Sequence, residues 1–130
     1  MSVDRYMHGC ATFKLGEKRF ALAGGGYSIN EGGMASVEIL DLSSLESQWL
    51  QGPDMPRELM ESRFLTNPTK DGVLAVAGIS GSDYQNAIFS MTCPDGTLAS
   101  CQWKVLDQTM NISRKDHAAV LVSDSVVSCA

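Results

Sequence analysis

The sequence has little clustered positive charge. Of its 130 residues, 10 are Lys or Arg and 15 are Asp or Glu, which gives a formal net charge of −5 at pH 7. The basic residues are scattered along the chain, whereas nucleic acids and anionic membranes are recognised through clusters of Lys and Arg. We therefore expect no nucleic-acid partner and no membrane partner.

Long hydrophobic runs are missing as well. No stretch approaches the roughly 18 consecutive apolar residues that a membrane-spanning helix needs. The opening residues MSVDRYMHGC lack the basic segment and apolar core of a secretory signal peptide. Together these features lead us to expect a cytoplasmic protein, with the nucleus as the other default compartment.

Cysteine is sparse, and its spacing does not fit a metal site. Cys10, Cys93, Cys101 and Cys129 form no CxxC pair, and none lies near a histidine at zinc-ligand spacing. Cys93 and Cys101 flank a Pro-Asp-Gly turn, which leaves open a cross-loop disulfide in an oxidising compartment. Free thiols are the state we expect, and we expect no metal or other cofactor.

Catalytic signatures are also lacking. The sequence contains no GxSxG, HExxH or P-loop motif. His8 and His117 occupy equivalent positions in the repeat described below, which favours a structural role for both. Four carboxylates fall in loop-like segments that give no acid–base geometry, and we expect them to be solvated or to form turns: Asp41, Asp54, Glu58 and Glu61.

The chain is instead rich in short apolar runs bounded by Gly, Pro, Asp, Asn and Ser. Convincing helical periodicity is absent, and the one candidate, PRELMESRF at 56–64, is short. The glycine-rich stretch RFALAGGG at 19–26 could be read as a phosphate loop, but such a loop opens a helix. A strand-like pattern follows it here, so the glycines are read as ending a strand, and the whole pattern predicts a β-rich protein.

Self-comparison of the sequence finds a repeat. FALAG at 20–24 reappears as LAVAG at 74–78, and Trp49 reappears as Trp103, both at an offset of 54 residues. Met55 maps onto Met110 at an offset of 55, and RYMHGCAT at 5–12 resembles RKDHAAVL at 114–121 at about twice that period. Repeats of this length are typical of β-propellers and solenoids.

Each repeat contains four strand-like runs, which is the content of one propeller blade. In the first repeat they are HGCATFKL, RFALAG, SVEILDL and QWLQGP. In the second they are RFLTNPT, GVLAVAG, NAIFSM and CQWKVLD. We expect two repeats, 1–56 and 57–110, followed by the first strands of a third, truncated repeat over 111–130.

The order of motifs resembles the kelch repeat. In the first copy the matching residues are Arg5, His8, Gly24-Gly25, Val37-Glu38 with Asp41, Trp49, and Met55-Pro56. The resemblance implies an all-β fold made of kelch-type β-propeller blades, each a four-stranded antiparallel sheet, in an incomplete ring. It marks these as structural repeat positions: Gly24, Gly25, Trp49, Gly78 and Trp103.

Neighbouring blades of a propeller pack face to face, and the tryptophans are expected to lie between them. The residues expected to form this packing are Leu22, Val37, Ile39, Trp49, Leu74, Val76, Ile88 and Trp103. The final SVVSCA aligns with KRFALA at 18–23, so we expect a segment of a larger propeller. The alternative is that several copies of the chain assemble into a ring.

The resemblance favours a protein–protein interaction module. The most distinctive loops are 25–36, 79–86 and 93–101, and the expected partner-binding residues on the propeller rim are Tyr27, Asn30, Tyr84 and Gln85. Kelch proteins recruit substrates to ubiquitin ligases or bind actin, which makes a ligase-adaptor or actin-associated role an expectation from kinship. The alternative is a fragment of a kelch-propeller enzyme of the copper-radical oxidase or sugar epimerase type.

Overall fold

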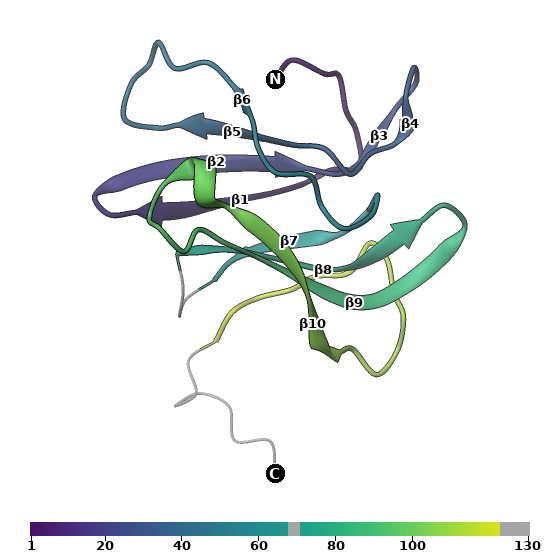
Figure 1. Cartoon of the computed structure of the whole chain (residues 1–130). Helices are drawn as coiled ribbons and strands as arrows, with labels where there is room; N and C mark the ends of the chain where they lie inside the picture. Colours follow the sequence, from purple (N-terminus) through teal and green to yellow (C-terminus); the bar gives the residue numbers. More distant parts are fainter. Residues whose placement is uncertain (68–70, 123–130) are drawn as a thin grey trace.

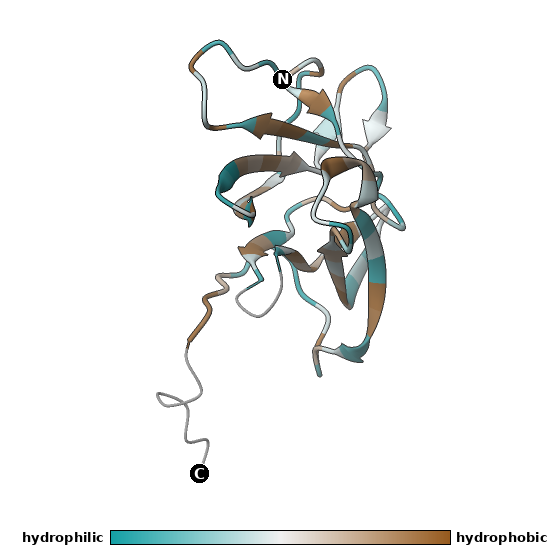
Figure 2. Ribbon diagram, turned by 60° about the vertical axis from the view of Figure 1, so that its left-hand side comes forward, coloured by the Kyte–Doolittle hydropathy of each residue, from teal (hydrophilic) through white to brown (hydrophobic). Residues whose placement is uncertain are grey.

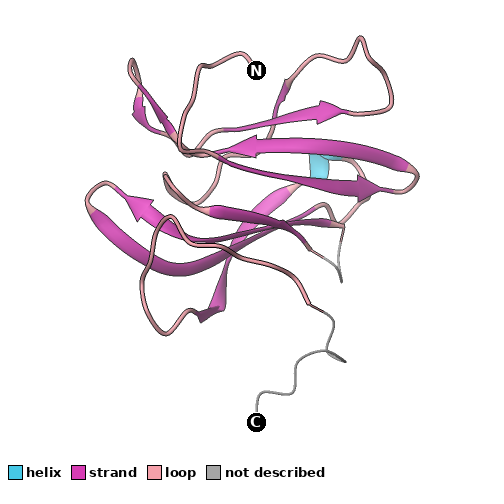
Figure 3. Ribbon diagram, turned by 180° about the vertical axis from the view of Figure 1, so that it is seen from behind, coloured by secondary structure: helices cyan, strands magenta, loops and turns pink. Residues whose placement is uncertain are grey.

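The computed structural model describes residues 1–67 and 71–122 of the chain (Figure 1). Its regular secondary structure is almost entirely β-strand, with loops joining the strands (Figure 3). The elements in chain order are β1 (Gly9–Leu15), β2 (Lys18–Gly24), β3 (Tyr27–Ser28), β4 (Gly32–Gly33), β5 (Val37–Asp41), β6 (Leu50–Gln51), β7 (Arg63–Thr66), β8 (Gly72–Ser80), β9 (Asp83–Thr92), the 3₁₀ turn η1 (Leu98–Ser100) and β10 (Gln102–Thr109). No helix in the described residues is long and apolar enough to cross a bilayer.

Two four-stranded antiparallel sheets form the molecule. The first has the strand order β1-β2-β5-β6 and the second has the order β10-β9-β8-β7. In each sheet the strands follow one another as a meander, except that the small hairpin β3–β4 is inserted between β2 and β5. The predicted all-β fold is confirmed, and the arrangement is consistent with two blades of an incomplete propeller.

The strands lie close to where the sequence places them. All eight strands of the two four-stranded sheets overlap the eight predicted runs, whereas the strands β3 and β4 were not predicted, and the segment 56–64 contains no helix. Residues 111–122 form no strand, so the described part of the predicted third repeat has none. The last part of that repeat, including the SVVSCA segment, lies outside the described residues.

One hydrophobic core lies between the two sheets, which stack face to face (Figure 1) with β1 against β7 and β8. Apolar residues occur along the strands of both sheets, as the brown segments of Figure 2 show. It is built from Phe13, Leu15, Phe20, Leu22, Val37, Ile39, Met55, Leu59, Phe64, Val73, Ala75, Phe89, Met91, Cys93 and Cys101. Since each sheet contributes only one face, each retains an outward face.

The predicted packing residues divide according to sheet. Leu22, Val37 and Ile39 of the first sheet are buried in the core as predicted. Their expected partners in the second sheet are only half-buried, because side chains alternate along a strand and these point away from the first sheet: Leu74, Val76 and Ile88. The second sheet turns the alternate residues inward, namely Val73, Ala75, Phe89 and Met91.

The segments that enter the two sheets repeat the same backbone geometry. Met7, Glu61 and Asp116 are non-glycine residues with positive φ angles of 58°, 53° and 46°. Glu61 donates its backbone N–H to the Met7 carbonyl at 2.9 Å, and Asp116 donates its own to the Glu61 carbonyl at 3.2 Å. The described residues therefore contain this backbone geometry three times, each time before a sheet or an expected sheet. His8 and His117, which the sequence comparison paired, directly follow the first and the third of these positions.

The glycine positions follow a slightly different spacing. Tyr6 forms an antiparallel bridge with Tyr27, and Met60 forms the equivalent bridge with Ile79. Tyr27 and Ile79 are 52 residues apart, so the turn that precedes them recurs after 52 residues. Gly26 is therefore the structural counterpart of Gly78, whereas the sequence comparison paired Gly24 with Gly78. The difference arises because the first repeat has two more residues between its entry segment and this turn.

Candidate functional site

The loops that were expected to bind a partner lie mostly on one edge of the molecule. The β3–β4 hairpin and the tip of the β8–β9 hairpin both project to the right in Figure 1. Between them runs the connector 57–61, which leads into the second sheet. We call this edge, made of residues 27–33, 57–61 and 79–85, the hairpin rim.

Tyr27 is held at the base of the β3–β4 hairpin. Its backbone N–H donates to the Tyr6 carbonyl at 2.8 Å, and Tyr6 donates to the Tyr27 carbonyl at 3.1 Å. The two rings are 5.5 Å apart, so Tyr27 is half-buried against Tyr6. Beyond it, Asn30 is exposed, and Ile29 at the hairpin tip has a relative exposure of 87%. The apolar side chain of Ile29 therefore stands in solvent at the rim.

The β8–β9 hairpin carries the other two predicted residues. Tyr84 has a relative exposure of 57%, and the Lys115 ammonium lies 6.0 Å from its ring centre. Gln85 is half-buried, and its side chain is already engaged in hydrogen bonds. It accepts one from the Arg57 guanidinium at 3.0 Å and donates another to the Asp83 carbonyl. Tyr84 is thus the available contact residue and Gln85 is a support.

Glu58 connects the two hairpins of the rim. Its Oε1 accepts a hydrogen bond from the backbone N–H of Gly81, at the tip of β8–β9, with a distance of 2.8 Å. The same carboxylate lies against Gly33 of the β3–β4 hairpin, where a Cβ would come within 2.4 Å of Oε2. The rim therefore has one defined shape, built from both repeats.

A buried ion pair supports the base of the rim from the first sheet. Arg5 Nη2 lies 2.9 Å from Glu38 Oε2, and both side chains are almost completely buried. Arg5 also donates to the carbonyls of Gly25 and Ser36, which flank the β3–β4 hairpin. Burial raises the pKa of Glu38, but hydrogen bonds from Ser2 and from Arg5 outweigh it, so the pKa lies below its ordinary value.

The structural glycines make space for closely approaching backbone, of the next repeat at Gly25 and of the same repeat at Gly78. Gly25 has a φ of 66°, and a Cβ there would lie 2.3 Å from the Leu59 carbonyl oxygen. Gly78 has a φ of 117°, and its Cβ would lie 2.6 Å from the Met60 carbonyl oxygen. Gly24 instead leaves room for the Phe64 ring of the second sheet. These positions serve the fold and are not available to a ligand.

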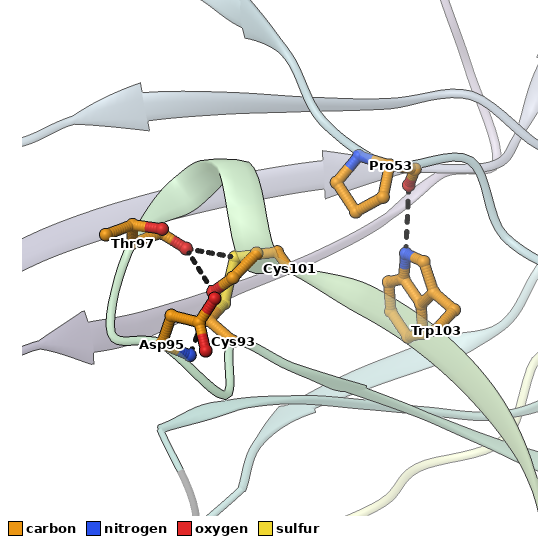
Figure 4. The surroundings of a disulfide bond; sticks show 7 residues. Pro53, Cys93, Asp95, Thr97, Cys101 and Trp103 are labelled. Carbon is orange, nitrogen blue, oxygen red and sulfur yellow. Dashed lines mark hydrogen bonds between the residues drawn. A yellow bond between two sulfur atoms is a disulfide. The ribbon is translucent and has the colours of Figure 1, made fainter.

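The two predicted tryptophans have different surroundings. Trp103 packs against the core, lies 6.0 Å from the Phe64 ring, and donates its indole N–H to the Pro53 carbonyl at 3.0 Å (Figure 4). Through Pro53, which follows β6 of the first sheet, Trp103 links the second sheet to the first repeat. Trp49 is half-buried on the outward side of the first sheet, beside a hollow of about 350 Å³ that it lines with Met1, Ser2, Ser47 and Gln48.

The third distinctive loop, 93–101, lies on the opposite edge. Cys93 and Cys101 form a disulfide across it (Figure 4), with their Cα atoms 3.9 Å apart. The expectation of free thiols was wrong for this pair, because β9 and β10 are hydrogen-bonded neighbours and bring the two ends of the loop together. Cys10 is a free, exposed thiol. The loop does not contribute to the hairpin rim.

Several ionisable groups of the described residues form turns or ion pairs. Among the described residues, no three His, Cys, Asp or Glu side chains are placed to hold a metal ion. Asp41 accepts hydrogen bonds from Ser43, as a turn former does, and these lower its pKa. Glu61 pairs with Lys115 at 3.2 Å.

The equivalent histidines lie in partly enclosed positions. Burial lowers the pKa of His117, as do the positive charges of Arg63 and Arg114, against the opposing effect of Asp116. Neither ring nitrogen of His117 has a hydrogen-bond partner within the described chain, and the same holds for Nδ1 of His8. Both follow a positive-φ entry residue, which agrees with a structural role.

Sequence reasoning missed two residues of the rim, Ile29 and Glu58, and also Tyr6, which packs against Tyr27 at the base of the rim. Ile29 was not singled out, although it is an apolar residue inside the predicted loop 25–36, which is a signal that could have found it. Glu58 was taken for a solvated charge, and its link to Gly81 depends on contacts across the repeats that no local pattern reveals. Comparison with known proteins adds no relative: no protein-family model matches the chain, and no curated protein matches it.

Proposed function

We propose that the chain is a protein–protein interaction module whose partner binds the hairpin rim. The observation that carries this proposal is that exposed Ile29 and Tyr84, which come from different repeats, stand on one rim that Glu58 holds together. Aromatic and apolar side chains on a rigid support are the usual anchors of protein interfaces. On the resemblance to kelch repeats, the role is that of a substrate-recruiting segment of a ubiquitin ligase adaptor or of an actin-associated protein.

The surroundings of the rim fit this role. Arg57, Glu58 and Lys115 place charges of both signs around the two apolar contacts, which provides the polar border that interfaces usually have. The hairpins are held by backbone hydrogen bonds at their bases. Binding would therefore require little ordering of the loops, which keeps its entropic cost low.

The experiment compares the chain with an Ile29→Ser/Tyr84→Ser variant. Both side chains are exposed, so the variant should retain its thermal midpoint to within a few degrees. Proteins captured from a lysate by the original chain are identified, purified, and titrated against both forms by calorimetry. The proposal predicts a loss of affinity of at least tenfold for the variant, since removing two interface anchors costs about 2 kcal/mol or more.

Leu45→Ser is the matched control. Leu45 is fully exposed on the β5–β6 loop, at the opposite edge from the hairpin rim. This variant should bind the purified partner as the original chain does. Equal affinity of the rim variant and the original chain would exclude the hairpin rim as the binding surface.

A further inference from the structure

The outward face of the second sheet has residues in positions equivalent to those that the first sheet buries in the interface between the sheets. Three apolar residues of the second sheet that point away from the core, Leu74, Val76 and Ile88, are the structural counterparts of Leu22, Gly24 and Val37. In the first sheet those counterparts are buried against the second sheet. The outward face of the second sheet therefore corresponds in position to a face that already packs on a sheet, with Ser90 at the position of Ile39.

The outward face of the first sheet has the complementary property. Across the second sheet, Thr66, Val73, Met91 and Trp103 form one row of paired residues that faces the first sheet. The corresponding row of the first sheet points outward and contains the paired residues Thr12, Ala21 and Leu40. Trp49 directly precedes β6 and is half-buried on the same side of the sheet. Val73 and Met91 are fully buried, whereas their counterparts Ala21 and Leu40 are only half-buried.

The two sheets thus pack head to tail. The inner face of the first sheet corresponds to the outward face of the second sheet. The inner face of the second sheet corresponds to the outward face of the first sheet. An interface of this heterologous type can be repeated between molecules, and it either closes a ring or extends. A symmetric dimer, in which two identical faces pair, would instead be complete with two copies.

We propose that the chain self-associates head to tail, with the outward face of the second sheet of one copy packed on the outward face of the first sheet of the next copy. The partner is a second copy of this chain, because the intrachain interface already displays the fit of these two kinds of face. In the assembly, Trp49 occupies the position that Trp103 occupies within the chain. Complete propellers have about four to eight blades, so two to four copies close a ring.

The inner face of the second sheet and the outward face of the first sheet differ at one pair of positions. The second sheet presents Leu59 and Phe89 to the core, whereas the first sheet has the Arg5–Glu38 ion pair at the corresponding positions. Glu38 also accepts hydrogen bonds from Ser2. Since the pair is already buried and bonded inside one chain, packing a second copy over it breaks no partner contact.

The test uses two variants that block different faces. Leu74→Lys places a charge on the outward face of the second sheet, and Ala21→Lys places one on the outward face of the first. Mass is measured by light scattering after size-exclusion chromatography, with the chain loaded from about 1 µM to about 1 mM, which spans strong to weak association. The original chain should rise from its 14.0 kDa monomer mass to two to four times that mass.

Each variant alone should remain monomeric, and an equimolar mixture of the two should form a species of twice the monomer mass. The mixture has one intact pair of complementary faces, which only head-to-tail association can use. Thr12→Lys, at an exposed position of the same row as Ala21, replaces Ala21→Lys if that variant loses the circular dichroism of the original chain.

Three results would overturn the proposal: a monomer at every concentration, association that neither variant prevents, and a mixture that stays monomeric. Association lost in Leu74→Lys but retained in Ala21→Lys would indicate a symmetric dimer of second sheets instead. The Ile29→Ser/Tyr84→Ser variant should self-associate normally, because the hairpin rim lies outside both faces. Self-association and partner binding are therefore tested independently.

Discussion

Glu61 donates its backbone N–H to the carbonyl of Met7 at 2.9 Å, and both residues have the left-handed backbone conformation that non-glycine residues rarely adopt. Asp116 repeats the conformation and donates in turn to Glu61. A conformation that costs about 1–2 kcal/mol at each residue and occurs three times at nearly equal spacing is a property of the repeat. It fixes how each unit is joined to the next.

Trp103→Ala should destabilise the fold far more than Trp49→Ala. The first substitution removes the Phe64 contact and the hydrogen bond to Pro53 at the sheet interface, at a cost of about 3–5 kcal/mol. The second removes a half-buried indole from an outward face, and about 1 kcal/mol is expected. Urea unfolding monitored by circular dichroism measures both at low protein concentration. Equal losses would mean that Trp103 does not have a special role between the sheets.

Glu38→Ala should cost about 3–5 kcal/mol, because it leaves the Arg5 guanidinium buried without its partner. Arg5→Met/Glu38→Met should recover most of that loss, since no uncompensated charge remains. Unfolding free energies of the single and double variants decide this. A double variant that is less stable than Glu38→Ala would contradict the assignment of the loss to the unpaired charge.

The same pair makes stability depend on acid. The pKa of Glu38 is lower in the folded chain than its ordinary value of 4.5, so the folded state binds its proton less readily than the unfolded state does. The stabilisation is therefore fully present above about pH 4.5 and is lost as the pH falls through the folded-state pKa. Glu38→Gln should show a shallower fall of unfolding free energy below that pH, and an unchanged slope would contradict this prediction.

Gly26→Ala should be much more destabilising than Gly16→Ala. Both glycines have positive φ, at 89° and 58°, which costs a non-glycine residue about 1–2 kcal/mol. A Cβ at Gly26 would also lie 2.6 Å from the Tyr6 carbonyl oxygen, whereas a Cβ at Gly16 would have nothing within 4 Å. The clash adds about 1–3 kcal/mol. Thermal unfolding of the two variants measures the difference, and similar midpoints would be evidence against the close approach at Gly26.

The disulfide should lock the 93–101 loop. Mapping with an alkylating reagent should leave Cys93 and Cys101 unlabelled until a reductant is added, whereas Cys10 is labelled from the start. Cys93→Ser/Cys101→Ser should lose about 2–4 kcal/mol, and Cys10→Ser should stay within about 0.5 kcal/mol of the original chain. Labelling of Cys93 before reduction would contradict the crosslink. Disulfides persist in oxidising compartments. This crosslink therefore fits an oxidising compartment, whereas the sequence led us to expect the cytoplasm.

The sequence predicts the sheets better than it predicts which face of a strand is buried. Apolar runs and turn residues locate all eight strands of the two four-stranded sheets, because both signals are local. In β8, however, both strand faces are apolar, so alternation does not distinguish Val73 from Leu74. Only packing against the first sheet decides that Val73 is the inward residue.

The candidate site was partly predictable for the same reason. Tyr84 and Asn30 are exposed on the rim as expected for residues that follow turns, whereas Tyr27 and Gln85 are engaged by contacts with Tyr6 and Arg57. Those contacts join residues more than 20 positions apart. Their geometry follows from the stacking of the repeats and has no local signature in the sequence.

The central claim is that successive repeats are joined by one recurring backbone contact. It is tested most directly by long-range NMR measurement of couplings across hydrogen bonds in isotopically labelled chain. The structure predicts a coupling between the Glu61 amide nitrogen and the Met7 carbonyl carbon, and a second between the Asp116 amide nitrogen and the Glu61 carbonyl carbon. Absence of both couplings, with rapid exchange of the two amide protons with solvent, would contradict the repeated architecture.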